Sequence, residues 1–312
     1  MRLNPEKFAG RLVPARPGLA AAHLRGAVEA ERFVEGVPHS VTAPVLDLRR
    51  SPSHGTGVET QLLRGEDFTV YETREDGFAW GQADLDGYVG YVDAAGLGPR
   101  QPADSHVRAL WSHVYAEPDI KSQALAELPF MARIAVAETS GAFTRLRDGG
   151  WMPSRHLVDG QRDFVAQAER FLGLPYLWGG RSARGIDCSG LVQLALQATG
   201  LAAPRDADMQ QDALGEALPP DAPLRRGDLI FWPGHVSIAI SDDTMIHANA
   251  HNMAVTLENV ASAIDRIERA GEGPVSARNR LAARSFDAGQ CVWRTAGLDS
   301  ASVQNANGRV SR

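Results

Sequence analysis

Cysteine is scarce in this chain, with only two among 312 residues. Two cysteines cannot build the disulfide framework that holds many small secreted domains together, so stability has to come from a packed core. Long apolar runs are missing too, whereas a membrane-spanning helix needs about 20 consecutive apolar residues. Residues 1–7 lack the apolar core of a secretory signal. We therefore expect a cytoplasmic protein with reduced thiols and no membrane partner.

Positive charge is also in short supply. The chain has 32 Lys and Arg against 38 Asp and Glu, which gives a formal net charge of −6. An acidic chain is a poor binder of nucleic acid, so we expect no nucleic-acid partner. The remaining composition, 44% hydrophobic and 22% charged, is that of an ordinary globular protein. The length favours two or three domains, and we expect a monomer.

One of the two cysteines, Cys188, lies where a glycine-rich loop turns into a helix. Apolar residues recur at helical spacing over 191–198, until Gly200 ends the run. Cys188 is therefore predicted in the first helical turn, with Asp187 or Ser189 as the cap. Because the helix dipole and exposed N–H groups stabilise a thiolate, we expect a depressed thiol pKa and a nucleophile. A small buried structural thiol is the alternative.

The other cysteine, Cys291, has neither a glycine loop before it nor a helix after it, and we interpret it as structural. Downstream of Cys188, residues 227–257 predict an antiparallel meander, because short apolar runs alternate with turn residues. The expected strands are 227–232, 235–240, 244–248 and 253–257.

Two histidines of this meander favour the nucleophile interpretation of Cys188. A turn centred on residues 241 and 242 places His235 opposite His247 or its neighbours, on one face of the sheet. A cysteine on a helix start, a histidine on a strand and a second polar residue on the next strand make a nucleophile, a base and an orienting group. A shift of strand register would replace His247 by Asn249 or His251.

Several motifs between residues 160 and 270 occur together in the order and spacing of one known family. They are Pro-Tyr-Leu-Trp-Gly-Gly at 175–180, Asp-Cys-Ser-Gly at 187–190, Pro-Arg-Asp at 204–206, Arg-Gly-Asp-Leu at 226–229 and Gly-His-Val-Ser-Ile at 234–238. On these motifs the chain resembles the NlpC-type cysteine peptidases, which cut bacterial cell-wall peptides. The resemblance implies an α+β, papain-like catalytic domain over 160–294, in which the helix bearing the nucleophile packs on an antiparallel sheet.

The resemblance also implies catalytic roles. Cys188 is the nucleophile, His235 the general base and acid, and His247 the residue that orients His235. The phenol of Tyr176 helps the Cys188 N–H to hold the oxyanion, where charge develops in the transition state. Ala207 is a departure, because a hydroxyl residue often follows the Arg-Asp pair in relatives that bind substrate there. This departure puts one substrate contact in doubt.

The chain ahead of this domain predicts two small barrels, at 38–100 and 104–158, because short alternating runs are broken by Gly and Asp. The segments 87–92 and 149–153 resemble the ends of bacterial SH3 domains. We expect residues 1–37 to form an extension that wraps the barrels, and residues 295–312 to form a disordered tail. Two such barrels before an NlpC-type domain resemble a subgroup that removes peptides from the free amino end of cell-wall fragments.

In that subgroup the first barrel leans over the active site and fixes the free amine of the substrate. The matching residues are Glu59 and Tyr88, with Asp187 as a third acceptor and Ser189 as a further contact. A buried ammonium needs charged and hydrogen-bonding partners, which makes this assignment sound physically. The alternative is that Glu59 is solvated and Tyr88 packs the barrel. Trp178 resembles a pocket wall, although a core tryptophan is the simpler interpretation.

The sequence therefore predicts a cysteine endopeptidase of murein peptides that carry a free N-terminal L-alanine. The bond expected to be cut joins D-glutamate, through its γ-carboxyl, to diaminopimelate or lysine, in murein recycling or turnover without a cofactor. One alternative is an amidase or acyltransferase with the same three residues, and another is an inert module that binds the cell wall. We expect no metal, because the close Cys and His spacing typical of zinc sites is absent.

Overall fold

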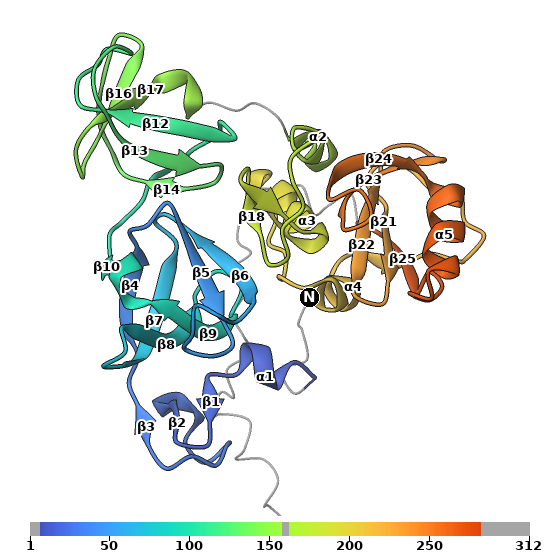
Figure 1. Ribbon diagram of the computed structural model, residues 1–312, viewed down its shortest axis with the longest axis horizontal. Coiled ribbons are helices and arrows are strands. Elements are labelled where there is room, and N and C mark those ends of the chain that lie inside the picture. Colours follow the sequence, from blue (N-terminus) through green and yellow to red (C-terminus); the bar gives the residue numbers. More distant parts are fainter. Residues whose placement is uncertain (1–6, 158–161, 282–312) are drawn as a thin grey trace, which may run out of the picture.

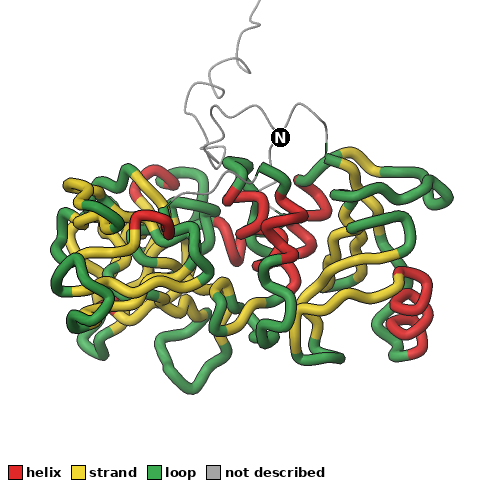
Figure 2. Tube along the Cα trace, turned by 90° about the horizontal axis from the view of Figure 1, so that it is seen from above, coloured by secondary structure: helices red, strands yellow, loops and turns green. Residues whose placement is uncertain are grey.

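The computed structural model describes residues 7–157 and 162–281 of the chain. The chain runs from an N-terminal segment through two parts built of strands to a mixed part of helices and a sheet (Figure 1). Seen from above, helices gather in the middle, with strands on both sides of them (Figure 2). None of the helices in the described ranges is long and apolar enough to cross a membrane. The predicted tail at 295–312 and Cys291 lie outside the described residues.

Residues 37–99 form the first barrel, an antiparallel sheet with the strand order β10-β4-β7-β8-β9-β5-β6. The strands are β4 (Val37–Val41), β5 (Val45–Arg49), β6 (Val58–Leu63), β7 (Asp67–Thr73), β8 (Phe78–Ala83), β9 (Val89–Asp93) and β10 (Leu97–Pro99), with a 3₁₀ turn at Ala94–Gly96. Side chains such as Leu48, Leu62 and Phe68 fill its interior. The predicted antiparallel strands of this part are confirmed.

The N-terminal segment packs on the first barrel. It contains α1 (Ala9–Leu12), β1 (Ala15–Arg16), β2 (Leu19–Ala21), a 3₁₀ turn at Ala22–Leu24 and β3 (Phe33–Val34). Phe8 and Leu12 join the barrel core, and Leu19 is buried against Trp80 and Tyr91 on another side. Burial of these side chains fixes the segment to the barrel, which brings α1 close to the catalytic part.

A second, smaller set of strands follows at residues 105–156. The strand order is β13-β12-β17-β16-β15, and β11 pairs separately with β14. The bounds are β11 (Ser105–His106), β12 (Trp111–Tyr115), β13 (Ala124–Pro129), β14 (Arg133–Ile134), β15 (Val136–Ser140), β16 (Phe143–Leu146) and β17 (Trp151–Pro153), followed by a 3₁₀ turn at Ser154–His156. Its own core includes Val107, Val114 and Met152.

Residues 162–281 combine helices with a sheet of order β20-β25-β21-β22-β23-β24. The helices are α2 (Phe164–Glu169), α3 (Cys188–Ala198), α4 (Ala207–Ala213) and α5 (Val260–Arg269). The strands are β18 (Arg181–Ser182), β19 (Gly185–Ile186), β20 (Glu216–Ala217), β21 (Leu229–Trp232), β22 (His235–Ala239), β23 (Thr244–Asn249), β24 (Ala254–Asn259) and β25 (Ala277–Arg280). The predicted meander is present as β21 to β24.

Helices cover both faces of this sheet. On one face, α3 buries Leu191 and Ala195 in a core that also contains Val236 and Ile246 of the sheet. On the other face, α5 buries Val260, Ala263 and Ile267 in a core that contains Ala239 and Met245. Successive residues of a strand point to opposite faces, so the sheet separates α3 from α5.

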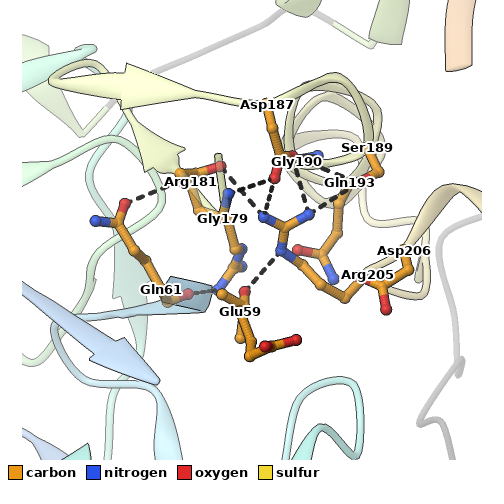
Figure 3. A network of polar contacts seen from close by, with 12 residues as sticks. Glu59, Gln61, Gly179, Arg181, Asp187, Ser189, Gly190, Gln193, Arg205 and Asp206 are labelled. Atoms are coloured by element: carbon orange, nitrogen blue, oxygen red, sulfur yellow. Dashed lines mark hydrogen bonds and ion pairs between the residues drawn. The ribbon is translucent and has the colours of Figure 1, made fainter. Parts of the chain in front are cut away.

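Two buried arginines join the catalytic part to the first barrel (Figure 3). Arg181 donates to both carboxylate oxygens of Glu66, each at 3.0 Å, and to the Gln61 carbonyl at 2.7 Å. Arg205 donates through Nε to the Thr60 hydroxyl at 2.6 Å. The two arginines are 0% and 1% exposed, so their charges depend on these partners. The barrel is therefore held against the catalytic part by bonds that lack competing solvent.

The first prediction concerns Arg181. The substitution Arg181→Ala leaves the buried Glu66 carboxylate without its counter-charge, and breaking such a pair costs about 3–5 kcal/mol. We expect the free energy of unfolding, measured by urea denaturation, to fall by that amount. The control Arg269→Ala removes an exposed pair with Asp265 and should change it by less than about 1 kcal/mol. Equal stability of the two variants would show that the buried pair does not hold the domains together.

Candidate active site

The loop before α3 places Cys188 as the first residue of that helix. Asp187 is the N-cap, and its Oδ1 accepts the Gly190 N–H at 2.7 Å. Its other oxygen accepts the Gly179 N–H at 2.8 Å. Gly179 has a φ of +76°, and a Cβ there would lie 2.7 Å from the Val58 carbonyl of β6. Glycine therefore lets this loop pass directly against the first barrel.

Arg205 completes the network around Asp187. Its guanidinium donates to the two carboxylate oxygens at 2.6 and 2.9 Å, and to the Ser189 hydroxyl at 2.9 Å. The Asp187 carboxylate thus already accepts from the helix, the preceding loop and an arginine. It therefore has a structural role, and its role as an acceptor for the amine of a substrate stays a prediction. Ser189, the other candidate cap, is held by Arg205 and lines the cavity described below.

Cys188 is a buried thiol rather than a preformed thiolate. Burial raises its pKa to about 12, and the neighbouring Asp187 charge acts in the same direction. The backbone N–H groups of Val236 and Ser189 donate to the sulfur and oppose this shift without cancelling it. The expected depressed pKa is wrong, because desolvation outweighs the helix N-terminus. The contact with Val236 places the sulfur next to the start of β22.

The two histidines meet as the meander predicts, with a small change of register. Ile238 pairs with Ile246 and Ala239 with Met245, so the turn centres on residue 242. His235 and His247 are therefore diagonal neighbours on one face of the sheet. His235 Nε2 lies 2.9 Å from His247 Nδ1.

The alternatives to His247 are engaged elsewhere. The Asn249 side chain donates to the Thr256 hydroxyl at 2.9 Å and accepts the Asn252 N–H at 2.8 Å. His251 is exposed in the turn after β23. The structure thus brings His247, and neither of these two residues, into contact with His235.

Two residues that the sequence did not indicate extend this histidine pair. His247 Nε2 lies 3.0 Å from Oε2 of Glu258, the penultimate residue of β24. Arg266 of α5 donates to both oxygens of Glu258, at 2.9 and 2.7 Å. The predicted strand ended at residue 257, whereas β24 continues to Asn259. Glu258 shares the face of His247 by strand alternation, so a strand one residue longer would have revealed it.

Burial keeps both imidazoles neutral. Desolvation lowers the pKa of His235 to about 3, with further lowering by His247 and the Arg266 charge. Desolvation also lowers the pKa of His247 to about 4, although Glu258 opposes this effect. The resting pair at Cys188 is therefore a thiol beside a neutral base, and ionisation has to accompany the reaction.

A cavity of about 310 Å³ opens above the sulfur. Its walls come from the catalytic part, the first barrel and α1 together. The lining residues are Arg11, Arg50, Glu59, Tyr88, Tyr176, Trp178, Asp187, Cys188, Ser189, Asp206, Ala207, Asp208 and Gly234. A cavity of this size fits a short peptide segment rather than a whole protein chain.

The first barrel contributes an acid and a phenol to the cavity. Tyr88 is buried in the barrel core, and its hydroxyl donates to Asp206 Oδ2 at 3.1 Å, with Glu59 Oε2 at 3.5 Å. Glu59 also accepts from Arg50 at 3.0 Å. Tyr88 therefore packs the barrel and faces the cavity at once, and Glu59 is not simply a solvated strand residue.

Asp206 and Arg11 are further residues that sequence reasoning missed. Arg11 of α1 donates to Asp206 at 2.6 Å and to Asp208 at 2.6 Å. Burial raises the pKa of Asp206, while Arg205 and Arg11 oppose this shift. Asp206 lay inside the Pro-Arg-Asp motif and could have been singled out there. Arg11 is 195 residues away in sequence and left no comparable sign.

Tyr176 and Trp178, in the segment before β18, also line the cavity. Burial raises the pKa of Tyr176, so its hydroxyl remains a proton donor. Trp178 is 66% exposed, so the interpretation as a core tryptophan is wrong. Each predicted site residue lines this cavity or belongs to the histidine pair.

Comparisons with known proteins agree with this arrangement. The family model "NlpC/P60 family" matches residues 173–266, and "Bacterial dipeptidyl-peptidase Sh3 domain" matches residues 48–97. The second strand-built part, residues 105–156, lies outside both matches, so its assignment as an SH3-like barrel stays a prediction.

Two relatives are matched over most of their own length. The gamma-D-glutamyl-L-lysine dipeptidyl-peptidase of Bacillus subtilis is 30% identical over 220 residues, which are 61% of this chain and 72% of the relative. The protein of the same name from Bacillus cereus is 28% identical over 237 residues, 65% of this chain and 71% of the relative. Both matches extend beyond the catalytic domain alone.

One solved structure shares the fold over almost its whole length. The NlpC/P60 family protein from Bacillus cereus covers 78% of this chain and 99% of its own, with a TM-score of 0.66 and 20% identity. At this identity the likeness shows the fold alone.

The second prediction concerns the neutral histidines. Their folded-state pKa values of about 3 and 4 lie below the ordinary value of about 6.5, so the unfolded chain takes up protons first as the pH falls. Stability is present above about pH 6.5 and is lost below it, by up to about 1.4 kcal/mol per pH unit for each histidine. In urea unfolding between pH 7 and 4, His247→Asn should flatten this dependence, whereas the exposed control His251→Asn should not. Equal slopes in both variants would contradict the buried neutral state.

The matches extend over the first barrel and the catalytic domain, and the B. subtilis relative is 30% identical with 72% of its length covered. The thiol, the histidine pair and the cavity lie within the matched domains. The chain belongs to the NlpC/P60 family, as a cell-wall cysteine peptidase with a bacterial SH3 domain ahead of its catalytic domain.

Proposed function

We propose that this peptidase cuts the bond between γ-D-glutamate and a diamino acid in murein peptides with a free N-terminal L-alanine. The observation that carries the proposal is the cavity, where the Cys188 thiol shares one space with Glu59, Tyr88 and Asp206. A nucleophile and a set of acceptors for a cation lie at two ends of one small site. Such a site suits a short substrate whose amino terminus is read while its chain is cut.

The acceptors suit an ammonium group. The carboxylates of Glu59 and Asp206 lie on either side of the Tyr88 hydroxyl, and all three are partly or fully withdrawn from solvent. An ammonium in such surroundings gains charge-assisted hydrogen bonds, whereas a neutral N-acetyl group brings no positive charge and forms none of them. The Arg50 side chain that now contacts Glu59 is 77% exposed, so it gives way at little cost.

The names of the relatives support a dipeptide as the released product. A dipeptidyl-peptidase releases two residues from a free amino end, and both Bacillus relatives carry that description together with γ-D-glutamyl-L-lysine. In this chain, the dipeptide L-alanyl-γ-D-glutamate would span the distance from the acceptors to the sulfur. Arg11 and Arg50 on the same wall offer partners for the free carboxylate of the D-glutamyl residue.

The proposed reaction begins at the Cys188 thiol. His235 takes the proton, and the sulfur attacks the carbonyl carbon of the γ-D-glutamyl amide. Because His235 Nε2 faces His247, Nδ1 is the ring nitrogen left for this transfer. The tetrahedral oxyanion would be held by the Cys188 N–H at the start of α3 and by the protonated Tyr176 phenol.

The second half of the reaction uses the same proton. His235 donates it to the departing amine of the diamino acid, which leaves a thioester between Cys188 and the dipeptide. A water molecule then attacks the thioester, with His235 again as the base, and the dipeptide is released. His247 holds the His235 ring in place throughout.

The finer points of architecture and role belong to the same proposal. We infer that the helix α3 on its antiparallel sheet is a papain-like arrangement, and that residues 104–158 form a second SH3-like domain. The short antiparallel strands with their own core support the latter. The proposed role is recycling or turnover of murein peptides by a cytoplasmic monomer.

The third prediction tests the bond and the amine together. Purified enzyme should release free diaminopimelate from L-alanyl-γ-D-glutamyl-diaminopimelate, and lysine from the corresponding lysine peptide. The N-acetylated copy should be cut at least about 100-fold more slowly, because acetylation removes the positive charge that the acceptors bind. The Cys188→Ala variant should release nothing. Equal cleavage of both peptides would remove the amine-reading role, and cleavage of neither would favour an amidase or a binding module.

The fourth prediction separates Tyr88 from its packing role. Tyr88→Phe keeps the ring in the barrel core but removes the hydroxyl between Glu59 and Asp206. Loss of a hydrogen bond to a charged group costs about 1.5–3 kcal/mol, so kcat/KM for the free peptide should fall roughly 10-fold to 100-fold. Tyr71→Phe, in the same barrel but outside the cavity lining, is the matched control and should leave kcat/KM unchanged. An unaltered Tyr88→Phe enzyme would assign that residue to packing alone.

A further inference from the structure

Behind the histidine pair, a carboxylate and a guanidinium continue the line of contacts away from Cys188. His235 contacts His247, His247 contacts Glu258, and Glu258 is held by two bonds from Arg266. We propose that the Glu258–Arg266 pair is a positioning device that sets the proton arrangement of both histidines and thereby aims an unprotonated nitrogen of His235 at the nucleophile. This inference rests on the proposed function only for the identity of the base.

The proton arrangement follows from the acceptor at the end of the line. Glu258 keeps a lowered pKa, chiefly through its hydrogen bond from Arg266, so it is an ionised carboxylate. A carboxylate only accepts, so His247 Nε2 at 3.0 Å has to carry the hydrogen. In a neutral imidazole the other nitrogen then has none, and His247 Nδ1 is an acceptor.

The same reasoning determines which nitrogen of His235 carries the hydrogen. Since His247 Nδ1 accepts, His235 Nε2 at 2.9 Å has to donate, and His235 Nδ1 is left without a hydrogen. That nitrogen is able to take the proton of the Cys188 thiol. With the opposite arrangement, Nδ1 of His235 would carry a hydrogen and could not act as a base. One carboxylate thus selects the reactive form of a residue that it does not touch.

The sheet explains why the device lies on the far side from the nucleophile helix. α3 covers one face, whereas Ala239 and Met245, two positions along their strands from Ser237 and His247, pack with α5 on the other. His235, as the first residue of β22, lies at the end of the sheet. Arg266 on α5 reaches Glu258 from that second face. The line of contacts therefore connects α5 to the catalytic end of the sheet.

The charges along the line act in opposite directions. The groups that influence the two rings are Glu258 of β24, Arg266 of α5 and His251 after β23, in addition to the rings themselves. The negative Glu258 stabilises the imidazolium that forms when His235 takes the thiol proton, and the positive Arg266 opposes it. Removing either charge should therefore shift the ionisation of the pair, with opposite signs.

The test compares Glu258→Gln with Arg266→Gln. Glu258→Gln keeps the size of the side chain but removes its charge. Losing a residue that orients a functional histidine typically costs about 10-fold to 100-fold in activity, so kcat should fall by that factor with KM nearly constant. The acid limb of the kcat/KM profile should move to lower pH, because the imidazolium is less stable. Arg266→Gln should move the limb to higher pH. Equal falls in activity without opposite shifts would indicate a merely structural role and overturn the proposal.

A second readout needs no peptide substrate. The rate of Cys188 alkylation by iodoacetamide, assigned by peptide mass mapping, reports how readily the thiol loses its proton to His235. At pH 7 the rate should fall several-fold in Glu258→Gln and stay unchanged in Asp265→Asn. The latter removes an exposed carboxylate on α5 that pairs with Arg269 and is the matched control. Equal alkylation rates in the two variants would overturn the proposal.

The two readouts also separate this inference from the proposed function. If the wild-type enzyme cuts neither peptide but Glu258→Gln still slows alkylation, the positioning device stands and the substrate assignment fails. If the wild-type enzyme cuts the free peptide and Glu258→Gln matches it in kcat, pH profile and alkylation, the device fails alone. Thermal unfolding of each variant confirms that the folded enzyme is being compared.

Discussion

The buried pairing of Arg205 with Asp187 is the interaction on which the rest of the site depends. Asp187 caps the helix that begins at Cys188, and Arg205 holds Asp187 while donating to Thr60 of the first barrel. A single guanidinium thus fixes the start of the nucleophile helix, the loop before it and the neighbouring domain. Because this arginine is 1% exposed, its partners cannot be exchanged for water without a large cost. The barrel that contributes Glu59 therefore forms part of the wall of the cavity at Cys188.

The burial of Cys188 and His235 determines how these two residues are charged before the reaction. Burial alone disfavours ions, so Cys188 rests as a thiol and His235 as a neutral imidazole. The charges of Glu258 and Arg266 lie two and three contacts away from His235, where they are paired and partly solvated. Such an arrangement keeps the resting enzyme free of an isolated buried charge. It still provides a field that favours the imidazolium when the substrate arrives.

Local patterns in the sequence were sufficient for the parts of the site that depend on neighbours along the chain. The glycine loop, the helix and the strand alternation placed Cys188, His235 and His247 together. A turn centred between residues 241 and 242 would set His235 opposite Ala248, and the observed centre at residue 242 is what gives the two histidines a shared face. The pKa of Cys188 was misjudged because the helix terminus is visible in a sequence and the depth of burial is not. Arg11 escaped prediction because its contacts join residues almost 200 positions apart.

The central claim is that the first barrel and the catalytic domain read and cut the substrate in one shared cavity. Its most direct test is a crystal structure of the Cys188→Ala protein with L-alanyl-γ-D-glutamyl-diaminopimelate bound. The account predicts the alanyl amine within hydrogen-bonding distance of Glu59, Tyr88 and Asp206, with the γ-amide carbonyl at the start of α3. A peptide whose amine points to solvent, or which lies outside the space between the two domains, would contradict the claim.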